Sequence, residues 1–198
     1  LMEPKEALLY YDKAIKYFPE SVFSDLIQYN IGLEFMKLKD FDNSIFAFKS
    51  LAVNFPASRY IPDAKFNIAE SQFEKGDYEN SCEEFKKFLK NYPENKILGK
   101  DAQFKLAVSL YELNRFDEAM QVFLNLKKTG GRIGEASAFA LALTYQMRGK
   151  VDDAVKEFRD FLKEYPSSAL NGRVYLWLAD YFYKKGDYAQ SIEFCGKI

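Results

Sequence analysis

Residue types that support catalysis or metal binding are absent or rare in this sequence. None of the 198 residues is a histidine, so the commonest general base and metal ligand is missing. The two cysteines, Cys82 and Cys195, lie far apart and lack the CxxC spacing of a zinc site or disulfide framework. We therefore expect no catalytic residue, no metal and no cofactor, and predict that the chain is not an enzyme.

Strong net charge and long apolar stretches are also missing. The formal net charge is -1, so no overall positive field attracts nucleic acid or anionic lipid. No apolar stretch is long enough to indicate a membrane-spanning helix. We expect neither a nucleic-acid partner nor a membrane span in this segment. With 48% hydrophobic residues, the composition is typical of an ordinary soluble protein with a substantial core.

What the sequence does contain is a repeat of about 37 residues. Small residues that the pattern places inside each unit recur at this period, which indicates a repeat architecture. These residues are Gly32, Ala69, Ala107, Ala142 and Ala179. Aromatic-proline pairs follow the same period, with one member missing, at Phe18-Pro19, Phe55-Pro56, Tyr92-Pro93 and Tyr165-Pro166.

Each unit has the pattern of two helices joined by a tight turn. In residues 56–92, Phe66, Ala69 and Phe73 follow the i, i+3, i+7 spacing of one helix face. Next comes Lys75-Gly76-Asp77, where glycine suits a left-handed helix end and aspartate suits the N-cap of the next helix. Proline then ends the unit because it cannot continue the helical hydrogen bonding.

Superposed units also share a column of small residues and, four residues later, a column of phenylalanines. The columns are Ser44, Ser81, Ala119, Ala154 and Ser191, then Phe48, Phe85, Phe123, Phe158 and Cys195. With the prolines, this pattern resembles the tetratricopeptide repeat. The resemblance implies an all-α fold, a right-handed superhelical α-solenoid of helix-turn-helix repeats that binds other proteins.

We interpret the chain as a single solenoid over residues 1–198, an excerpt from a longer protein. Its predicted parts are a partial repeat at 3–18 and repeats at 19–55, 56–92, 93–129, 130–165 and 166–198. The period exceeds the standard 34 residues by about three. We expect the extra residues to add one turn to the start of the first helix, with Ser21, Ser58 and Ser168 as N-caps.

The stretch "TGGRIGEA", residues 129–136, replaces one aromatic-proline pair. Glycines before a helix resemble an anion-binding turn, but the Lys-Ser/Thr ending of a phosphate loop is missing. We favour a flexible or tightened junction here. Of the cysteines, Cys195 occupies a phenylalanine column and is expected to be buried, whereas Cys82 is expected to be partly exposed.

The long proline-serine-aromatic form of the repeat resembles tetratricopeptide proteins of the bacterial cell envelope. That subgroup includes the lipoprotein of the outer-membrane β-barrel assembly machine and the periplasmic partner of the Tol-Pal system. The resemblance implies a location in the bacterial periplasm or at the outer membrane. A cytoplasmic scaffold with the same columns is the alternative.

Partner binding is expected on the first helices of the units, which line the inner face in the family that the chain resembles. Projecting the repeat positions predicts a groove with an aromatic floor and acidic flanks. Its residues are Tyr29, Phe66, Glu70, Phe73, Glu74, Phe104, Tyr111 and Glu112. Such a groove suits a protein or peptide that presents apolar and basic residues. The alternative is that these aromatics pack between repeats, as a solenoid core requires.

Three functions fit these features. The first is a non-catalytic interaction scaffold or adaptor in a bacterial envelope assembly. The second is a regulatory or targeting arm of an enzyme whose catalytic domain lies outside this segment. The third is a scaffold that self-associates through apolar faces at the ends of the repeat array.

Overall fold

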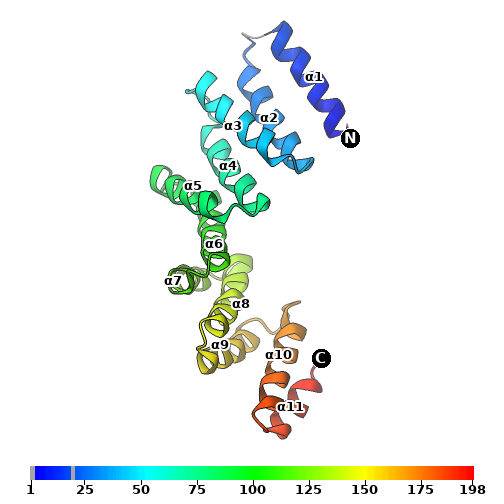
Figure 1. Ribbon diagram of the computed structural model, residues 1–198, viewed down its shortest axis with the longest axis vertical. Helices are drawn as coiled ribbons and strands as arrows, with labels where there is room; N and C mark the ends of the chain where they lie inside the picture. The colour runs from blue at the N-terminus through cyan, green and yellow to red at the C-terminus, as the bar shows by residue number, and fades with distance from the viewer. Residues whose placement is uncertain (1–2, 19–20) are drawn as a thin grey trace. The chain divides into compact units, whose positions relative to one another are not determined.

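The computed structural model describes residues 3–18 and 21–198. All regular secondary structure in these residues is helical, as the repeat pattern predicts (Figure 1). Pro19, the first proline of the predicted series, lies outside the described residues. The helices are α1 (Pro4–Tyr17), α2 (Ser24–Lys37), α3 (Phe41–Asn54), α4 (Ile61–Lys75), α5 (Tyr78–Asn91), α6 (Lys96–Glu112), α7 (Phe116–Lys127), α8 (Gly131–Met147), α9 (Val151–Glu164), α10 (Asn171–Lys184) and α11 (Tyr188–Cys195).

The chain divides into two compact units, Leu1–Leu113 and Asn114–Ile198. In the first unit each helix from α1 to α5 packs against the next, and α4 also contacts α6. In the second unit the same succession runs from α7 to α11. Such contacts between successive helices are those of an α-solenoid, in which each repeat touches its neighbours.

The turn inside each repeat forms as the sequence predicts. Gly76 ends α4 with a φ of 81°, in the left-handed region, and the Asp77 side chain accepts a hydrogen bond from the Asn80 backbone N–H. Asp40 and Asp187 cap α3 and α11 in the same way. At the other end of the repeat, α3, α5 and α9 each stop at the aromatic residue before a proline.

The prediction that the extra residues lengthen the first helix is wrong for the units with Ser58 and Ser168, whereas α6, which follows Pro93, starts at Lys96 and runs for 17 residues. After Phe55 the chain makes two successive turns, and α4 starts only at Ile61. Ser58 is not an N-cap: its hydroxyl accepts from the Tyr60 N–H at 3.2 Å and donates to the Asp25 carboxylate at 2.7 Å. Such side-chain bonds satisfy the backbone outside a helix.

The other two predicted capping serines behave alike. Ser168 accepts from the Leu170 N–H and donates to Glu135 of α8, while the Ser21 hydroxyl accepts from the Phe23 N–H. Conversely, α8 lacks the proline-serine turn and runs for 17 residues, compared with 14 for α10. The serine turns therefore replace a helical turn.

The glycine-rich junction at 129–136 is tightened. Helix α8 begins at Gly131, directly after Gly130, and both have positive φ. Gly134 is buried, and a Cβ there would lie 3.0 Å from the Lys127 carbonyl oxygen and 3.4 Å from the Tyr165 hydroxyl. The backbone of α8 thus approaches the end of α7 so closely that a Cβ at residue 134 would force its neighbours to shift by a few tenths of an ångström.

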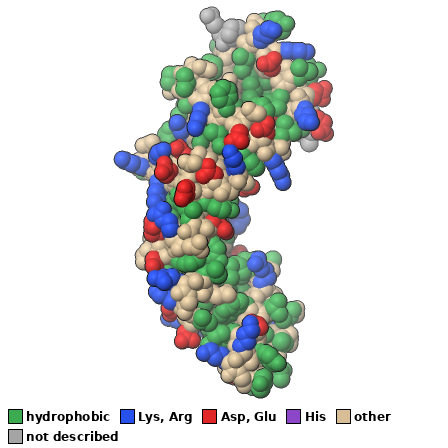
Figure 2. Space-filling view, viewed as in Figure 1, with side chains coloured by type: hydrophobic (Ala, Val, Ile, Leu, Met, Phe, Trp, Pro, Cys, Tyr) green, Lys and Arg blue, Asp and Glu red, His purple; other side chains and the backbone are tan. Residues whose placement is uncertain are grey.

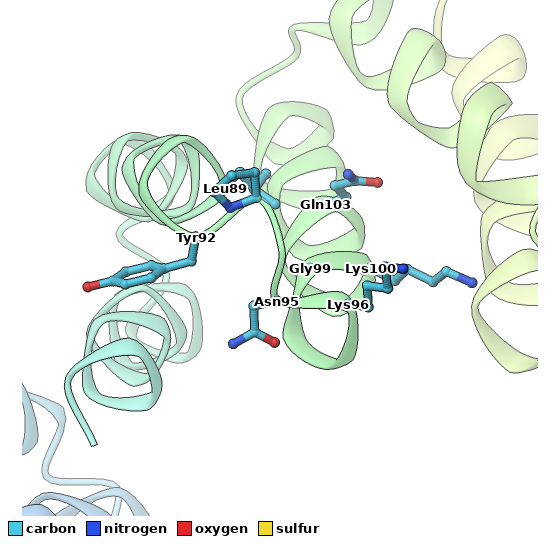
Figure 3. A pocket seen from close by; sticks show the side chains of 8 residues that line it. Leu89, Tyr92, Asn95, Lys96, Gly99, Lys100 and Gln103 are labelled. Atoms are coloured by element: carbon cyan, nitrogen blue, oxygen red, sulfur yellow. The ribbon is translucent and has the colours of Figure 1, made fainter. Parts of the chain in front are cut away.

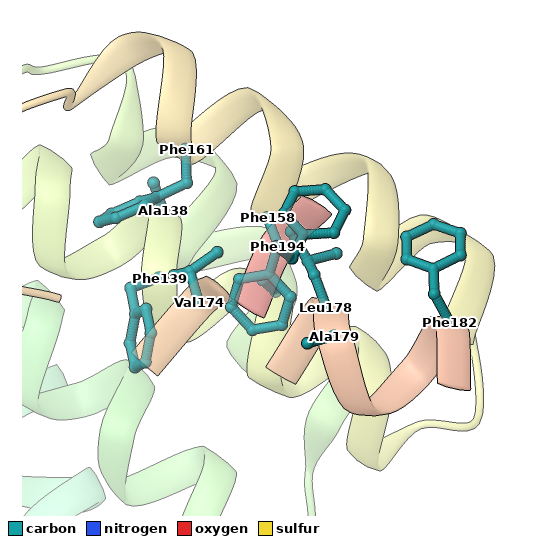
Figure 4. Packing of buried hydrophobic residues seen from close by; sticks show 10 residues of the cluster. Ala138, Phe139, Phe158, Phe161, Val174, Leu178, Ala179, Phe182 and Phe194 are labelled. Carbon is teal, nitrogen blue, oxygen red and sulfur yellow. The ribbon is translucent and has the colours of Figure 1, made fainter. Parts of the chain in front are cut away.

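The phenylalanine column forms the core of the repeats. Phe48, Phe85, Phe123 and Phe158 are at most 1% exposed, and Figure 4 shows Phe158 among the buried residues of the second unit. The small column has a separate role, because the Ser44 hydroxyl donates to the Gly32 carbonyl at 3.0 Å. Ser191 donates to the Ala179 carbonyl in the same way, which ties the two helices of a repeat together.

Both cysteine predictions are wrong. Cys82 is 3% exposed, with its Sγ 4.0 Å from the Leu106 carbonyl oxygen of α6, so it faces the next repeat. Cys195 is exposed, and its neighbour Phe194 is buried instead, 5.8 Å from the Phe182 ring centroid. Burying a phenyl ring removes more apolar surface from water than burying a thiol. This difference favours the rotation of α11 that turns Phe194 inward.

We expect one fast and one slow thiol in the native chain. Exposed Cys195 should react with an aromatic disulfide reagent at the rate of an accessible thiol. Cys82 should react at least about a hundredfold more slowly, because it must wait for the fold to open. Stopped-flow absorbance of the released thiolate measures both rates. A Cys82→Ser variant should retain only the fast phase, and two equal rates in the parent chain would contradict the assigned burial.

Candidate functional site

All eight predicted contact residues lie in the first unit, on α2, α4 and α6. Helices α4 and α6 contact each other, so their side chains share one face. Positions three or four residues apart lie above one another on a helix. Phe66, Glu70 and Phe73 of α4 follow this spacing, but the structure gives each of them a different environment.

Tyr29 of α2 is held by other parts of the fold. Its ring stacks on Tyr60 with centroids 5.2 Å apart, and its hydroxyl accepts a hydrogen bond from the Asn67 amide at 3.1 Å. Burial raises the pKa of the Tyr29 hydroxyl, and the Asn67 bond opposes this shift only in part. Tyr29 therefore joins α2 to α4, and only part of its ring remains accessible.

Phe66 belongs to the core. Its side chain is 9% exposed and meets the rings of Phe85 and Phe88 edge-on, at centroid distances of 5.7 Å. The alternative expectation, that the predicted aromatics pack in the solenoid core, therefore holds for Phe66. Phe66 consequently packs against α5 and offers little surface to a partner.

Glu70 and Phe73 share a partner that sequence reasoning missed, Lys105 of α6. The Lys105 ammonium lies 2.7 Å from a Glu70 carboxylate oxygen and 4.7 Å from the Phe73 ring centroid. A cation over an aromatic face is attracted by the ring quadrupole. The sequence contained one indication that Lys105 lies on this face. It directly follows the predicted Phe104 and shares a repeat position with Asn67.

The Glu70 carboxylate is therefore paired within the protein, with the Lys105 ammonium. Burial raises the pKa of its carboxyl; the hydrogen bond and charge of Lys105 lower it, and the charges of Glu74 and Asp101 raise it again. The second carboxylate oxygen of Glu70 is buried and has no hydrogen-bond partner among the described residues. The acidic flank thus depends on the other two predicted glutamates.

Glu74 and Glu112 are exposed, and the aromatics beside them, Phe73 and Tyr111, are half-buried. Burial raises the pKa of the Tyr111 hydroxyl, and the neighbouring Glu112 charge adds to this shift. Phe104 is also half-buried. We call the surface formed by Phe73, Glu74, Phe104, Tyr111 and Glu112 the α4–α6 face. It combines partly accessible rings with two exposed carboxylates.

A separate hollow lies elsewhere in the first unit. Its volume is about 500 Å³. Figure 3 shows it at the end of α5 and the start of α6. None of the predicted contact residues lines it, and its charged side chains are Lys96 and Lys100. It is therefore separate from the α4–α6 face and opposite in charge.

The second unit has a pocket of about 500 Å³ between α8 and α10. It is lined by Phe139, Leu143, Phe158, Arg173, Leu176, Trp177 and Asp180. Phe139 and Leu176 stand three residues before Ala142 and Ala179, the same inward repeat position as Phe66 and Phe104, but this repeat position gives no role to Arg173 or Trp177. The signal that was available is that Trp177 is the chain's single tryptophan, next to the inward Leu176.

Residues 3–18 and 21–198 show neither a candidate membrane span nor a candidate metal site. Every helix in this part of the chain is too short or too polar to span a bilayer. The same residues contain no group of three or more Cys, Asp or Glu side chains that could hold a metal ion. Figure 2 shows acidic and basic side chains interspersed over the visible face, in line with a net charge of -1.

Two family models match the sequence. That of the YfiO family, described as an outer membrane lipoprotein, matches residues 25–115, and a tetratricopeptide-repeat model matches residues 139–197. The chain is a tetratricopeptide-repeat protein. This confirms the family that the sequence pattern resembles. A comparison with curated proteins finds no match.

Several solved structures share the fold, one of them that of a tetratricopeptide repeat protein. A tetratricopeptide repeat protein from Parabacteroides merdae ATCC 43184 superposes with a TM-score of 0.73 at 17% identity, covering 98% of this chain and 72% of that one. MamA from Desulfovibrio magneticus RS-1 gives 0.70 at 15% identity, covering 87% and 92%. BtubC from P. vanneervenii gives 0.70 at 14%, covering 98% and 86%. At these identities the likeness concerns the fold alone.

Proposed function

We propose that this tetratricopeptide-repeat chain is a non-catalytic scaffold that holds a basic and apolar segment of a partner protein on its α4–α6 face. The observation that carries the proposal is the pairing of half-buried Phe73 and Tyr111 with exposed Glu74 and Glu112 on adjacent first helices. Aromatic side chains supply large contact area at interfaces, and complementary charge speeds association.

Lys105 limits how a partner uses this face. Its ammonium covers one side of the Phe73 ring, so a partner contacts the remaining exposed part of that ring. Because Lys105 also neutralises Glu70, a cationic side chain of the partner is drawn toward Glu74 and Glu112. Apolar groups of the partner then lie against Phe73, Phe104 and Tyr111.

We expect charge and ring substitutions on this face to act on different rates. Reversing Glu74 and Glu112 to lysine should slow association and weaken its salt dependence. Phe73→Ala or Tyr111→Ala should instead speed dissociation, by about tenfold or more for an anchoring ring. The partner is captured with the full-length protein from its native organism, and surface plasmon resonance then measures both rates.

Matched control variants separate these effects from general ones. Glu79→Lys on α5 makes the same change of charge as each single reversal, at another exposed position, and Phe46→Ala removes a ring that is 70% exposed on α3. Both should bind as the parent chain does. If Phe73→Ala and Tyr111→Ala also bind as the parent does while remaining folded, the α4–α6 face is not the contact surface.

We further propose that the scaffold works in a bacterial cell-envelope assembly, in the periplasm or at the outer membrane. The match of residues 25–115 to an outer membrane lipoprotein family supports this location. Fractionation of native cells, followed by immunodetection of the full-length protein, should find it in the periplasmic or outer-membrane fraction. Recovery in the cytosol with a cytosolic marker enzyme would contradict the proposed location and leave the binding face unaffected.

A further inference from the structure

The pocket between α8 and α10 has an apolar floor that the fold holds in place. Phe139 and Phe158 are 9% and 1% exposed, and their rings meet edge-on at 5.8 Å. Trp177 forms a wall, with its ring centroid 4.6 Å from that of Phe158. Leu176 at the rim is 62% exposed, so apolar surface remains accessible to a ligand.

The Trp177 ring is fixed from two further sides. Its indole N–H donates to the Gln146 side-chain oxygen at 2.8 Å, and its face stacks on Tyr181 at 5.7 Å with the planes 5° apart. A side chain held in this way does not have to be ordered when a ligand arrives, which lowers the entropic cost of binding. The aromatic part of the pocket is therefore preformed.

The charges at the rim are not equivalent. Asp180 pairs with Lys184 at 2.7 Å. Arg173 has no carboxylate partner in the described part of the chain, and its guanidinium carbon lies 5.0 Å from the Phe139 ring centroid. A guanidinium laid over a ring keeps its edge N–H groups available for an anion. The pocket thus presents one unpaired positive group beside an apolar cavity.

We propose that this pocket binds a peptide segment in which a large apolar or aromatic side chain stands next to an acidic residue. The cavity of about 500 Å³ receives the apolar side chain, in the size range of ligand sites. The Arg173 guanidinium receives the carboxylate, whose two oxygens match its fork of donors. This ligand is opposite in charge to the one proposed for the α4–α6 face, so the second unit serves a different segment.

The probe is a displayed library of random heptapeptides, selected on the whole 198-residue chain. Enriched sequences should combine an aromatic or large aliphatic residue with an adjacent aspartate or glutamate. Since Trp177 is the single tryptophan and lines the pocket, each synthesised peptide should change its emission saturably under selective excitation. Selection of basic or uncharged peptides, no enrichment, or binding that leaves Trp177 emission unchanged overturns the proposal.

Variants of the rim charge then test the role of Arg173. Arg173→Gln should weaken binding by about tenfold or more, as expected for the loss of a charge-assisted hydrogen bond. Arg173→Lys should be intermediate because lysine keeps the charge without the fork. Lys156→Gln, which removes an exposed charge on α9, should bind as the parent does. Equal affinity of Arg173→Gln and the parent, with unchanged circular dichroism, overturns the assignment.

The outcome is independent of the function proposed for the first unit. Phe73→Ala and Tyr111→Ala lie on α4 and α6 and should leave the Trp177 titration unchanged. If those variants lose the native partner while the peptide still binds at Trp177, both proposals stand. If the variants still bind the native partner, only the α4–α6 proposal fails; if the parent chain binds no peptide at Trp177, only the α8–α10 proposal fails.

Discussion

Replacing Phe158 by alanine is expected to lower the free energy of unfolding of the second unit by about 3–5 kcal/mol, the range for a buried phenylalanine. Phe158 is 1% exposed, and its ring contacts both Phe139 and Trp177. Figure 4 shows it within the buried cluster formed by α8, α9, α10 and α11. Truncation leaves a cavity that these fixed neighbours cannot close.

Trp177 makes this loss measurable, because it lies against the ring that is removed. Urea unfolding followed by tryptophan emission should show a lower midpoint with a similar slope. Ile192→Ala is the matched control, since Ile192 is 71% exposed on α11 in the same unit. It should change stability by no more than about 0.5 kcal/mol. A shift below about 1 kcal/mol for Phe158→Ala would mean that Phe158 is not a central core residue.

The helices and their turns were predictable because their signals are local. Gly76 and Asp77 stand in sequence where one helix ends and the next begins, and both take the predicted roles. The phenylalanine column likewise follows from a period that every unit repeats. Such features depend on backbone preferences and on spacing within one unit, which a single sequence contains in full.

The serine turns show where this local reasoning fails. Ser58 is a good N-cap by residue type, but its hydroxyl reaches Asp25 of the preceding repeat. Ser168 reaches Glu135 in the same way. A capping preference of about 1 kcal/mol is close in size to the hydrogen bonds that compete with it. Which arrangement forms is therefore decided by the neighbouring repeat.

The candidate site was predicted less well than the fold, because it depends on contacts between helices. The spacing on α4 places Phe66 and Phe73 on one side of the helix, yet a small rotation buries Phe66 and leaves Phe73 half-exposed. The sequence predicted that Glu70 offers its charge to a partner, whereas Lys105 from α6 pairs with it. The reach of a long side chain across two helices is not contained in a repeat period.

Gly32→Ala should destabilise the first unit, although alanine is the residue at this position in the other repeats. A Cβ on Gly32 would lie 2.5 Å from the Phe48 ring, which is fully buried. Forcing extra volume into a packed core costs typically 1–3 kcal/mol, and so close a contact belongs at the upper end. Alanine regains about 1 kcal/mol of helix propensity. The expected net loss is about 2 kcal/mol.

Gly99→Ala on α6 is the matched control, because no atom lies within 4 Å of the added Cβ. There the propensity gain stands alone, so this variant should be more stable than the parent by up to about 1 kcal/mol. The same substitution thus has opposite signs at two helical positions of one unit. Urea unfolding followed by far-ultraviolet circular dichroism measures both changes, and hydrogen exchange should locate the loss in α2 and α3.

A second substitution tests whether the Phe48 ring is the cause. Phe48→Leu shortens the side chain that meets the new methyl group, so Gly32→Ala should cost less in that background than in the parent chain. The two changes should therefore be non-additive by about 1 kcal/mol or more, as expected for residues in direct contact. Additive effects would show that Gly32 is required for another reason. The ring of Phe48 would then not be what excludes alanine from the first repeat.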